Sequence, residues 1–352
     1  MNAKSKHKKK LFIRVIFIFL LILLISAVSI GYSYYKKIYS VNVRLNLNDE
    51  YVCIPTGSSF DDVVRILTQK NILVNSSSFE WLAEKKNYVT HIKPGRYKIH
   101  KGMNNNELVN LLRSGKQEPV TIVIRGFRNA YELAGSVSHK LEADSISIVS
   151  LFEDEMTAQK YGFTLPSFIL IIVPNTYEFY WNTSASEFIH RMAKEYKAFW
   201  NDERKQKAKQ INLSQSEVGI LASIVQLETN KKDEMPDIAG VYINRLRKGM
   251  RLQADPTVIY AVGDFSIRRV TQEHLNFASP YNTYLHEGLP PGPVCIPYSF
   301  SMDAVLNYKV HNFLYFCARS DFSGYHVFAR TLNEHANNAR KYQNALNKRK
   351  IY

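Results

Sequence analysis

Glu228 occupies a position at which a carboxyl group could act as an acid. Ser214 and Glu217 have the spacing of a capping box, which predicts that a helix begins there. Glu228 follows Leu221 by seven residues and Ile224 by four, so its carboxyl falls on the apolar stripe of that helix, near the C-terminal end. The stripe consists of Val218, Leu221, Ala222, Ile224 and Val225.

Two physical effects would raise the pKa of a carboxyl at this position. Desolvation disfavours the anion, and so does the negative end of the helix dipole. A carboxyl that is protonated near neutral pH can donate its proton to a leaving oxygen, which is what cleavage of a glycosidic bond requires. A glutamate in a last helical turn is more often solvated or paired, and Lys231 and Lys232 are available partners. Spacing alone therefore leaves both interpretations open.

The segments after Glu228 concentrate polar groups and aromatic rings. Pro236 is predicted to begin a second helix, which Gly249 ends. The apolar side of this helix is expected to hold Ile238, Val241, Tyr242 and Leu246. Residues 250–260 and 281–293 then combine polar side chains and rings with proline and glycine. Rigid loops of this composition suit a groove that binds sugar, although they also serve as stiff connectors.

Two similar units precede this region in the sequence. Residues 55–67 and 100–112 are offset by 45 positions, and each is predicted to run from a short strand through a glycine turn into a capped helix. A strand–helix–helix–strand unit of this size resembles the LysM domain, a small sugar-binding module. A generic α+β packing unit would have the same pattern. A weaker copy of the same pattern begins at Gly126. Residues 142–200 are predicted to be helical with one break at 173–177.

The N-terminal segment is predicted to be a membrane anchor. Val15–Tyr35 contains no charged residue over 21 positions, enough to cross the hydrocarbon core of a bilayer. The run ends in tyrosines rather than at a small-residue cleavage site, which favours a retained anchor over a cleavable signal peptide. Lys36 and Lys37 follow it, and six basic residues precede it: Lys4, Lys6, Lys8, Lys9, Lys10 and Arg14. The positive-inside rule then leaves the N-terminus in the cytoplasm and the remainder outside.

The composition indicates a folded protein that is unlike the common nucleic-acid-binding and disulfide-rich classes. A hydrophobic share of 45% is typical of folded domains, and the net charge of +15 suits a polyanionic partner. Nucleic acid is disfavoured because no zinc, helix-turn-helix or RNA-binding signature is present, which leaves lipid headgroups and cell-wall carboxylates. Cys53, Cys295 and Cys317 form neither a disulfide framework nor a metal pattern. Buried free thiols are expected, with a Cys295–Cys317 bridge as the alternative.

Five linked motifs resemble the MltG (YceG-like) family of endolytic murein transglycosylases. They are Leu221–Thr229, Val241–Leu246, Gly249–Tyr260, Tyr281–Tyr284 and Gly288–Pro293, and the likeness continues to Leu314–Phe316 and His326–Phe328. The resemblance covers most of residues 40–345 in the same order. The chain departs from the family at Gln226, where a glutamate is frequent, and at Asn175, where an aspartate is common.

The resemblance and the patterns together predict an α+β protein. We expect a cytoplasmic basic tail over residues 1–14, a single transmembrane helix over 15–35 and a spacer over 36–50. A LysM-like α/β subdomain is expected over 51–125, followed by an α+β catalytic domain of the YceG-like type over 126–352. The expected location is the bacterial plasma (inner) membrane, with the catalytic domain outside. Neither an organic cofactor nor a metal is implied.

The resemblance implies a lytic transglycosylase in which Glu228 is the catalytic acid and base. Glu228 would protonate the oxygen between N-acetylmuramic acid and N-acetylglucosamine, and then accept the proton of the C6 hydroxyl as a 1,6-anhydro ring closes. Residues expected to bind substrate are Asn244, Arg245, Gln253, Asp255, Tyr260 and Asn282. Asp255 could also be the second carboxylate of a hydrolase. A structural role as a helix N-cap before Pro256 is the favoured interpretation for it.

The implied substrate is the peptidoglycan glycan strand, nascent rather than mature, cleaved close to the membrane. Penicillin-binding proteins or other wall synthases are the protein partners that this task suggests. Two further functions stay open: a two-carboxylate muramidase that uses Glu228 and Asp255, and a non-catalytic wall-binding scaffold that uses the repeated modules.

Overall fold

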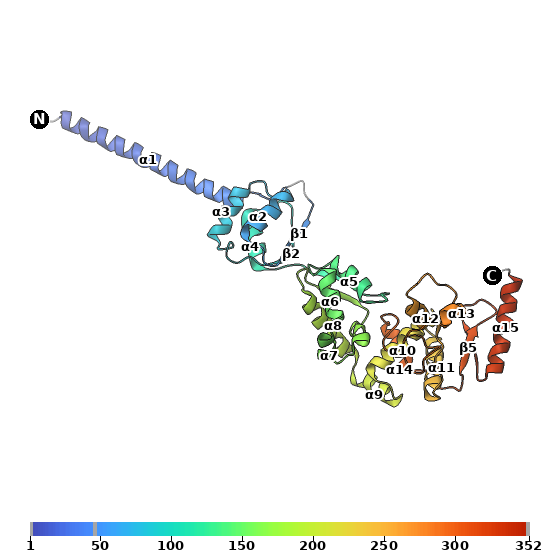
Figure 1. Ribbon diagram of the computed structural model, residues 1–352. Coiled ribbons are helices and arrows are strands. Elements are labelled where there is room, and N and C mark those ends of the chain that lie inside the picture. Colours follow the sequence, from blue (N-terminus) through green and yellow to red (C-terminus); the bar gives the residue numbers. More distant parts are fainter. Residues whose placement is uncertain (1–2, 45–47, 350–352) are drawn as a thin grey trace. The chain divides into compact units, whose positions relative to one another are not determined.

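The chain folds into two compact units (Figure 1). The computed structural model describes residues 3–44 and 48–349. The division falls between Val120 and Thr121, and Tyr180–Asn182 belong with the first unit. Short strands and many helices give the α+β character that the sequence predicted.

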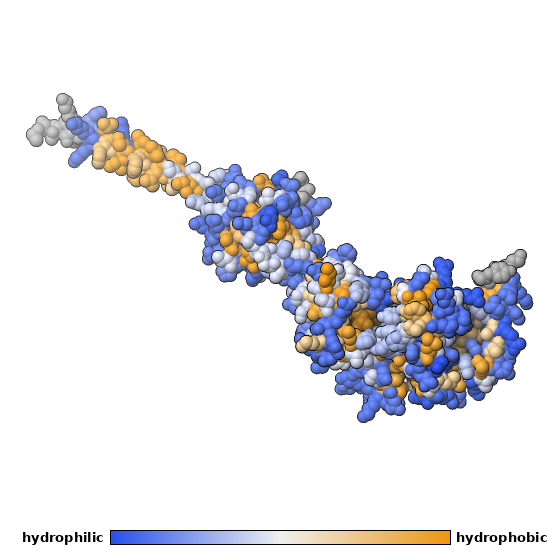
Figure 2. All heavy atoms as spheres, in the orientation of Figure 1, coloured by the Kyte–Doolittle hydropathy of each residue, from blue (hydrophilic) through white to orange (hydrophobic). Residues whose placement is uncertain are grey.

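Helix α1 (Ala3–Tyr39) is an exposed apolar helix, longer than the uncharged run over 15–35. Figure 2 shows an apolar band along it that is bounded by a polar segment toward its N-terminal end. Among the described residues it is the one helix long and apolar enough to cross a membrane. The predicted N-terminal apolar helix is therefore confirmed.

The first unit has the predicted strand–helix–helix–strand order and adds a third helix. Its elements are β1 (Glu50–Ile54), α2 (Phe60–Gln69), α3 (Ser76–Lys85), β2 (Gly95–Ile99) and α4 (Asn105–Ser114). Strands β1 and β2 pair antiparallel, with Glu50 opposite Ile99. Ser59 forms a capping box with Asp62 at the start of α2, and Asn104 forms one with Glu107 at the start of α4. The sequence repeat is therefore repeated in local structure.

The segment predicted as a spacer over 36–50 is in part packed against the first unit. Val43 is 1% exposed and joins its core. The buried Asn42 Nδ2 donates to Asn105 Oδ1 (2.6 Å), and Asn105 Nδ2 donates to the carbonyl of Lys37 (2.8 Å). These amides satisfy one another inside the fold and tie the end of α1 to α4. Residues 41–43 of the predicted spacer over 36–50 thus contact the first unit, while 45–47 lie outside the described residues.

The second unit begins with small helices and a two-stranded ladder. Its first elements are β3 (Val120–Val123), α5 (Ala130–Ser138), α6 (Ser145–Phe152), α7 (Glu155–Lys160), the 3₁₀ helix η1 (Leu165–Ile171), β4 (Thr176–Phe179) and α8 (Ala185–Phe199). Strands β3 and β4 pair. The predicted helical break at 173–177 is present and leads into β4, because Tyr177 and Phe179 alternate inward while their neighbours face solvent.

The second part of this unit is built around α10. Its elements are α9 (Asp202–Gln210), α10 (Gln215–Glu228), α11 (Met235–Arg247), α12 (Asp255–Val262), α13 (Gln272–Leu275), α14 (Ser299–Leu306), β5 (Tyr315–Ala318), β6 (His326–Ala329) and α15 (Leu332–Lys348). Helix α10 packs against α9, α11, α12, α14 and η1. Residues 218–225 are consequently all buried, so the predicted one-sided stripe was too narrow.

Candidate active site

Glu228 is the last residue of α10 and faces a cavity of about 340 Å³. The helix begins at the predicted capping box of Ser214 and Glu217. Thr229 then turns the backbone to an extended conformation (φ −147°, ψ 142°). The cavity is lined by Glu228, Tyr242, Arg245, Leu252, Gln253, Asp255, Tyr284, Tyr315, Phe316, Leu332 and His335.

The surroundings of the Glu228 carboxyl favour its neutral form. Loss of hydration raises the pKa of Glu228 to about 7, and the charge of Asp255 acts in the same direction. Two contacts oppose this shift: the Tyr242 hydroxyl donates to Glu228 Oε1 (2.6 Å), and the Arg245 guanidinium favours the anion. The carboxyl can therefore both hold and release a proton near neutral pH, as an acid–base catalyst must.

Asp255 is the first residue of α12 and not its N-cap. Ala254 occupies the N-cap position and provides no side-chain cap, so the predicted capping role is wrong. The carboxylate instead accepts a hydrogen bond from the Tyr284 hydroxyl (2.7 Å) at the cavity wall. Desolvation together with this bond raises the pKa of Tyr284, so the phenol stays a donor.

Asn244 and Arg245 use their donors on backbone carbonyls. Asn244 Nδ2 donates to the carbonyls of His311 (2.7 Å) and Phe313 (3.0 Å), and Asn244 is absent from the cavity wall. Arg245 Nε donates to the carbonyl of Leu314 (2.6 Å) and Nη1 to that of Leu252 (2.8 Å). Arg245 is only 7% exposed, although it lines the cavity. Both residues therefore fix the segments around the cavity.

Gln253 lines the cavity from a strained backbone position. Its φ of +50° lies in the left-handed region, which side-chain-bearing residues enter at an energetic cost. The conformation is held by Thr283, whose carbonyl accepts from Gln253 N (3.1 Å) and whose hydroxyl accepts from Ala254 N (3.0 Å). Thr257 bonds the same hydroxyl (2.8 Å). This buried pair of threonines fixes the backbone from which the side chains of Gln253 and Asp255 project.

Two further predicted binding residues, Tyr260 and Asn282, lie away from the cavity, as Asn244 does. Tyr260 packs on Tyr281, with 4.8 Å between ring centroids. Asn282 is fully buried, donates to the carbonyls of Leu275 and Phe277, and accepts from Tyr284 N. Asn282 thus positions the tyrosine that bonds Asp255. Of the seven residues predicted for the site, the cavity brings together Glu228, Arg245, Gln253 and Asp255.

Sequence reasoning missed several cavity residues. These are Tyr242, Leu252, Tyr284, Tyr315, Phe316, Leu332 and His335. Tyr242 was assigned to the apolar side of α11, and its hydroxyl was the available signal, because a buried phenol requires a hydrogen-bond partner. The residues of β5 and α15 lie some 90 positions or more after Glu228, a separation that no periodicity spans.

A buried carboxylate, Glu234, holds the loop that follows Glu228. Glu234 is 4% exposed; its Oε1 accepts from His326 N (2.6 Å), and its Oε2 lies 2.8 Å from His326 Nδ1. The Thr229 hydroxyl donates to the same carboxylate (3.2 Å). This contact fixes the residue directly after Glu228 to strand β6.

Gln226 has a structural role on another side of α10. Its Oε1 accepts from Tyr298 N (2.6 Å) and from the Ser301 hydroxyl (3.0 Å), which holds the start of α14. Among the described residues no cysteine forms a disulfide, as expected, but of the three only Cys295 is buried, and its burial raises the pKa of the thiol to about 12. Within the described ranges, no group of three histidine, cysteine, aspartate or glutamate residues could hold a metal ion.

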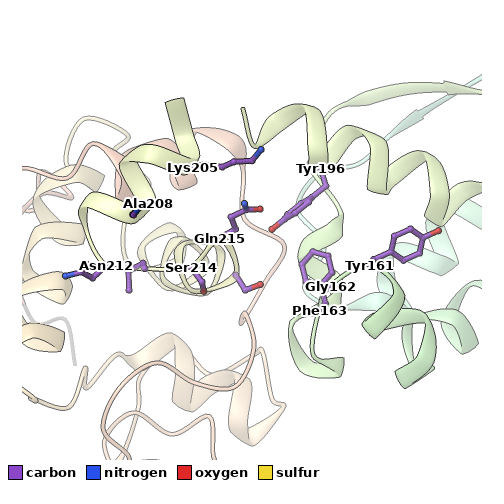
Figure 3. Close-up of a pocket in the computed structure, with 12 residues that line it drawn as sticks. Tyr161, Gly162, Phe163, Tyr196, Lys205, Ala208, Asn212, Ser214 and Gln215 are labelled. Atoms are coloured by element: carbon purple, nitrogen blue, oxygen red, sulfur yellow. The ribbon is translucent and has the colours of Figure 1, made fainter. Parts of the chain in front are cut away.

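A larger hollow of about 650 Å³ lies at the opposite end of α10 (Figure 3). Gln215 and Tyr196 point toward one another across it, with Phe163 and Tyr161 on the side of Tyr196. A helix of this length separates the two hollows by about 20 Å. Lys205 and Lys209 are the charged residues of its lining, so it holds no proton donor comparable to Glu228. The chemistry is therefore assigned to the smaller cavity.

A carboxyl with a raised pKa at the edge of a core, in an open cavity of an α+β domain, is a candidate acid–base site. The chain belongs to the YceG-like family, whose pattern matches residues 52–341. An endolytic murein transglycosylase of Bacillus subtilis (strain 168) is 28% identical to it over 312 residues, covering 84% of this chain and 85% of that protein.

Two further comparisons agree with this membership. An endolytic murein transglycosylase of Streptococcus pneumoniae (serotype 2, strain D39) is 27% identical over 354 residues, and the match covers 90% of this chain and 63% of that protein. The crystal structure of a YceG-like protein from Listeria monocytogenes has a TM-score of 0.55 and 28% identity, covering 82% of this chain and 98% of that one.

Replacing Glu234 with alanine should destabilise the second unit by about 3 kcal/mol, because His326 and Thr229 lose a buried partner. Denaturant unfolding of the full chain, followed by hydrogen exchange in peptides from 215–262, measures the loss. The same change at the exposed Glu203 is the control and should have little effect. Equal protection in both variants would show that Glu234 does not hold the loop.

Proposed function

We propose that the chain is an endolytic murein transglycosylase in which Glu228 is both acid and base. The observation that carries this proposal is the Glu228 carboxyl at the cavity, with a pKa of about 7. Membership of the YceG-like family and the names of the relatives from Bacillus and Streptococcus support the same activity. The substrate is the glycan strand of peptidoglycan.

One carboxyl suffices for the proposed reaction. The protonated Glu228 gives its proton to the oxygen that joins N-acetylmuramic acid to N-acetylglucosamine, and the bond from C1 to that oxygen breaks. The resulting carboxylate then accepts the proton of the muramic C6 hydroxyl, whose oxygen bonds to C1. A 1,6-anhydro end forms, Glu228 regains its proton and no water is consumed. A pKa near the working pH serves both transfers.

Asp255 and Tyr242 adjust the proton affinity that desolvation gives to Glu228. The Asp255 charge disfavours a second negative charge beside it, and the Tyr242 hydroxyl stabilises the anion that forms after the first transfer. The runner-up function is a muramidase in which Asp255 orients an attacking water. Asp255 lines the same cavity, which is the observation in favour of that second function.

Helix α1 is proposed to anchor the enzyme in the plasma membrane. Its apolar band is long enough to span a bilayer, and basic residues at its start favour a cytoplasmic N-terminus. Both compact units then lie outside, where the anchor confines cleavage to strands near the membrane. Wall synthases such as penicillin-binding proteins are the partners that this location favours.

Glu228→Gln should lower the rate of strand cleavage by about 10³-fold, since the amide cannot donate a proton as an acid. Full-length protein is incubated with purified glycan strands, and the product ends are weighed by mass spectrometry. Anhydro ends are expected from the native chain, because they are lighter by one water than the reducing ends of a muramidase. The exposed Glu203→Gln is the control. Undiminished cleavage by Glu228→Gln would refute the assignment.

Two neighbouring substitutions should move the pH profile in opposite directions. The protonated carboxyl is the active acid, so kcat/KM should fall as pH rises through the pKa of about 7. Tyr242→Phe removes a bond that favours the anion, so the pKa rises and the fall moves to higher pH. Asp255→Asn removes a charge that disfavours the anion, so the fall moves to lower pH. Shifts of the same sign in both variants would contradict this account.

A further inference from the structure

His335 lines the Glu228 cavity from the first turn of α15 and has no role in the reaction as described above. Its ring stacks on Tyr315, with 5.4 Å between centroids and 22° between planes. Tyr315 in turn lies 5.1 Å from the guanidinium of Arg245. Because this packing fixes the plane of the imidazole, its edges keep a defined direction relative to the cavity.

The hydrogen-bonding capacity of His335 is unused. Its Nδ1 is enclosed by protein and has no partner. Among the residues that the structure describes, Tyr88 Oη and Trp200 Nε1 share this condition, but neither residue lines the cavity that holds Glu228. An unpaired buried polar atom costs about 1–3 kcal/mol. Because Nδ1 is enclosed, a ligand in the cavity cannot reach it, and Nε2 is the ring nitrogen left to exchange a hydrogen bond there.

The imidazole is held in its neutral form. Desolvation lowers the pKa of His335, and the charge of Arg245 lowers it further. A neutral imidazole offers one donor nitrogen and one acceptor nitrogen. The neighbouring Arg245 already uses its Nε and Nη1 on the carbonyls of Leu314 and Leu252.

We propose that His335 contacts the substrate, exchanging a hydrogen bond with a hydroxyl group of an amino sugar beside the scissile bond. This inference rests on the proposed function, because it takes the occupant of the cavity to be a glycan strand. A sugar hydroxyl both donates and accepts, so it can pair with Nε2 in either tautomer of the ring. Since Nδ1 is enclosed, Nε2 is the atom that meets the hydroxyl. His335 is thus a substrate-binding residue of the Glu228 cavity.

The test compares two replacements of His335 in the full-length protein. His335→Phe keeps a ring that can stack on Tyr315 and removes both nitrogens, whereas His335→Gln keeps a donor and an acceptor. With purified glycan strands, kcat/KM of the Phe variant should fall about tenfold or more. The Gln variant should retain most of the native value. His190→Phe, at an exposed histidine of α8, is the matched control and should leave kcat/KM unchanged.

Strand binding is measured separately in the Glu228→Gln background, in which cleavage does not interfere. Adding His335→Phe there should weaken binding by a similar factor. Thermal unfolding of each variant identifies a folding defect. If His335→Phe unfolds, His335→Leu takes its place, because it removes the same nitrogens with less bulk. Native kcat/KM and native binding in the nitrogen-free variant would overturn the proposal.

The two proposals fail in distinguishable ways. If the native chain binds strands in a His335-dependent manner but does not cleave them, the proposed function is wrong and the binding role stands. If the native chain cleaves strands and the nitrogen-free variant cleaves and binds them equally well, the binding role is wrong and the proposed function stands.

Discussion

The site depends on the burial of one carboxyl at the end of the central helix. Helices α9, α11, α12 and α14 cover α10 and bury its residues 218–225, and Glu228 at its end is half-buried at the cavity. Glu228 therefore loses hydration, and its pKa rises to about 7. The Asp255 charge and the Tyr242 hydroxyl adjust that value from either side. Proton affinity here is a consequence of packing, with the neighbouring groups as smaller corrections.

Several polar residues in and near the motifs hold backbone, whether or not they also line the cavity. Asn244 and Arg245 bond the segment before β5, Asn282 bonds residues 275 and 277, and Glu234 bonds β6. The loops consequently have fixed directions, and Glu228 is held with little freedom to move. Such support is what keeps a catalytic group in a productive geometry. Polar residues of the motifs therefore hold the loops around the cavity in place as well as lining it.

Local structure was predictable where the signal is local. The capping box at Ser214, the proline start of α11 and the paired strand–turn–helix repeats follow from short-range spacing. Contacts between distant segments were not predictable in this way. Tertiary packing brings β5 and α15 to the cavity wall. It also places Asp255 where it accepts a hydrogen bond from Tyr284 instead of capping α12. The packing of Val43, in the expected spacer, was unpredictable for the same reason, because it pairs with Leu73, 30 residues later.

The central claim is that the Glu228 carboxyl holds a proton near neutral pH. Titration of the glutamate side-chain carboxyls by ¹³C NMR tests it directly, with the Glu228 signal assigned by its loss in Glu228→Gln. A midpoint near 7 is the expected result. A midpoint near 4.5, the ordinary value for glutamate, would mean that the carboxyl is ionised at neutral pH and cannot be the acid.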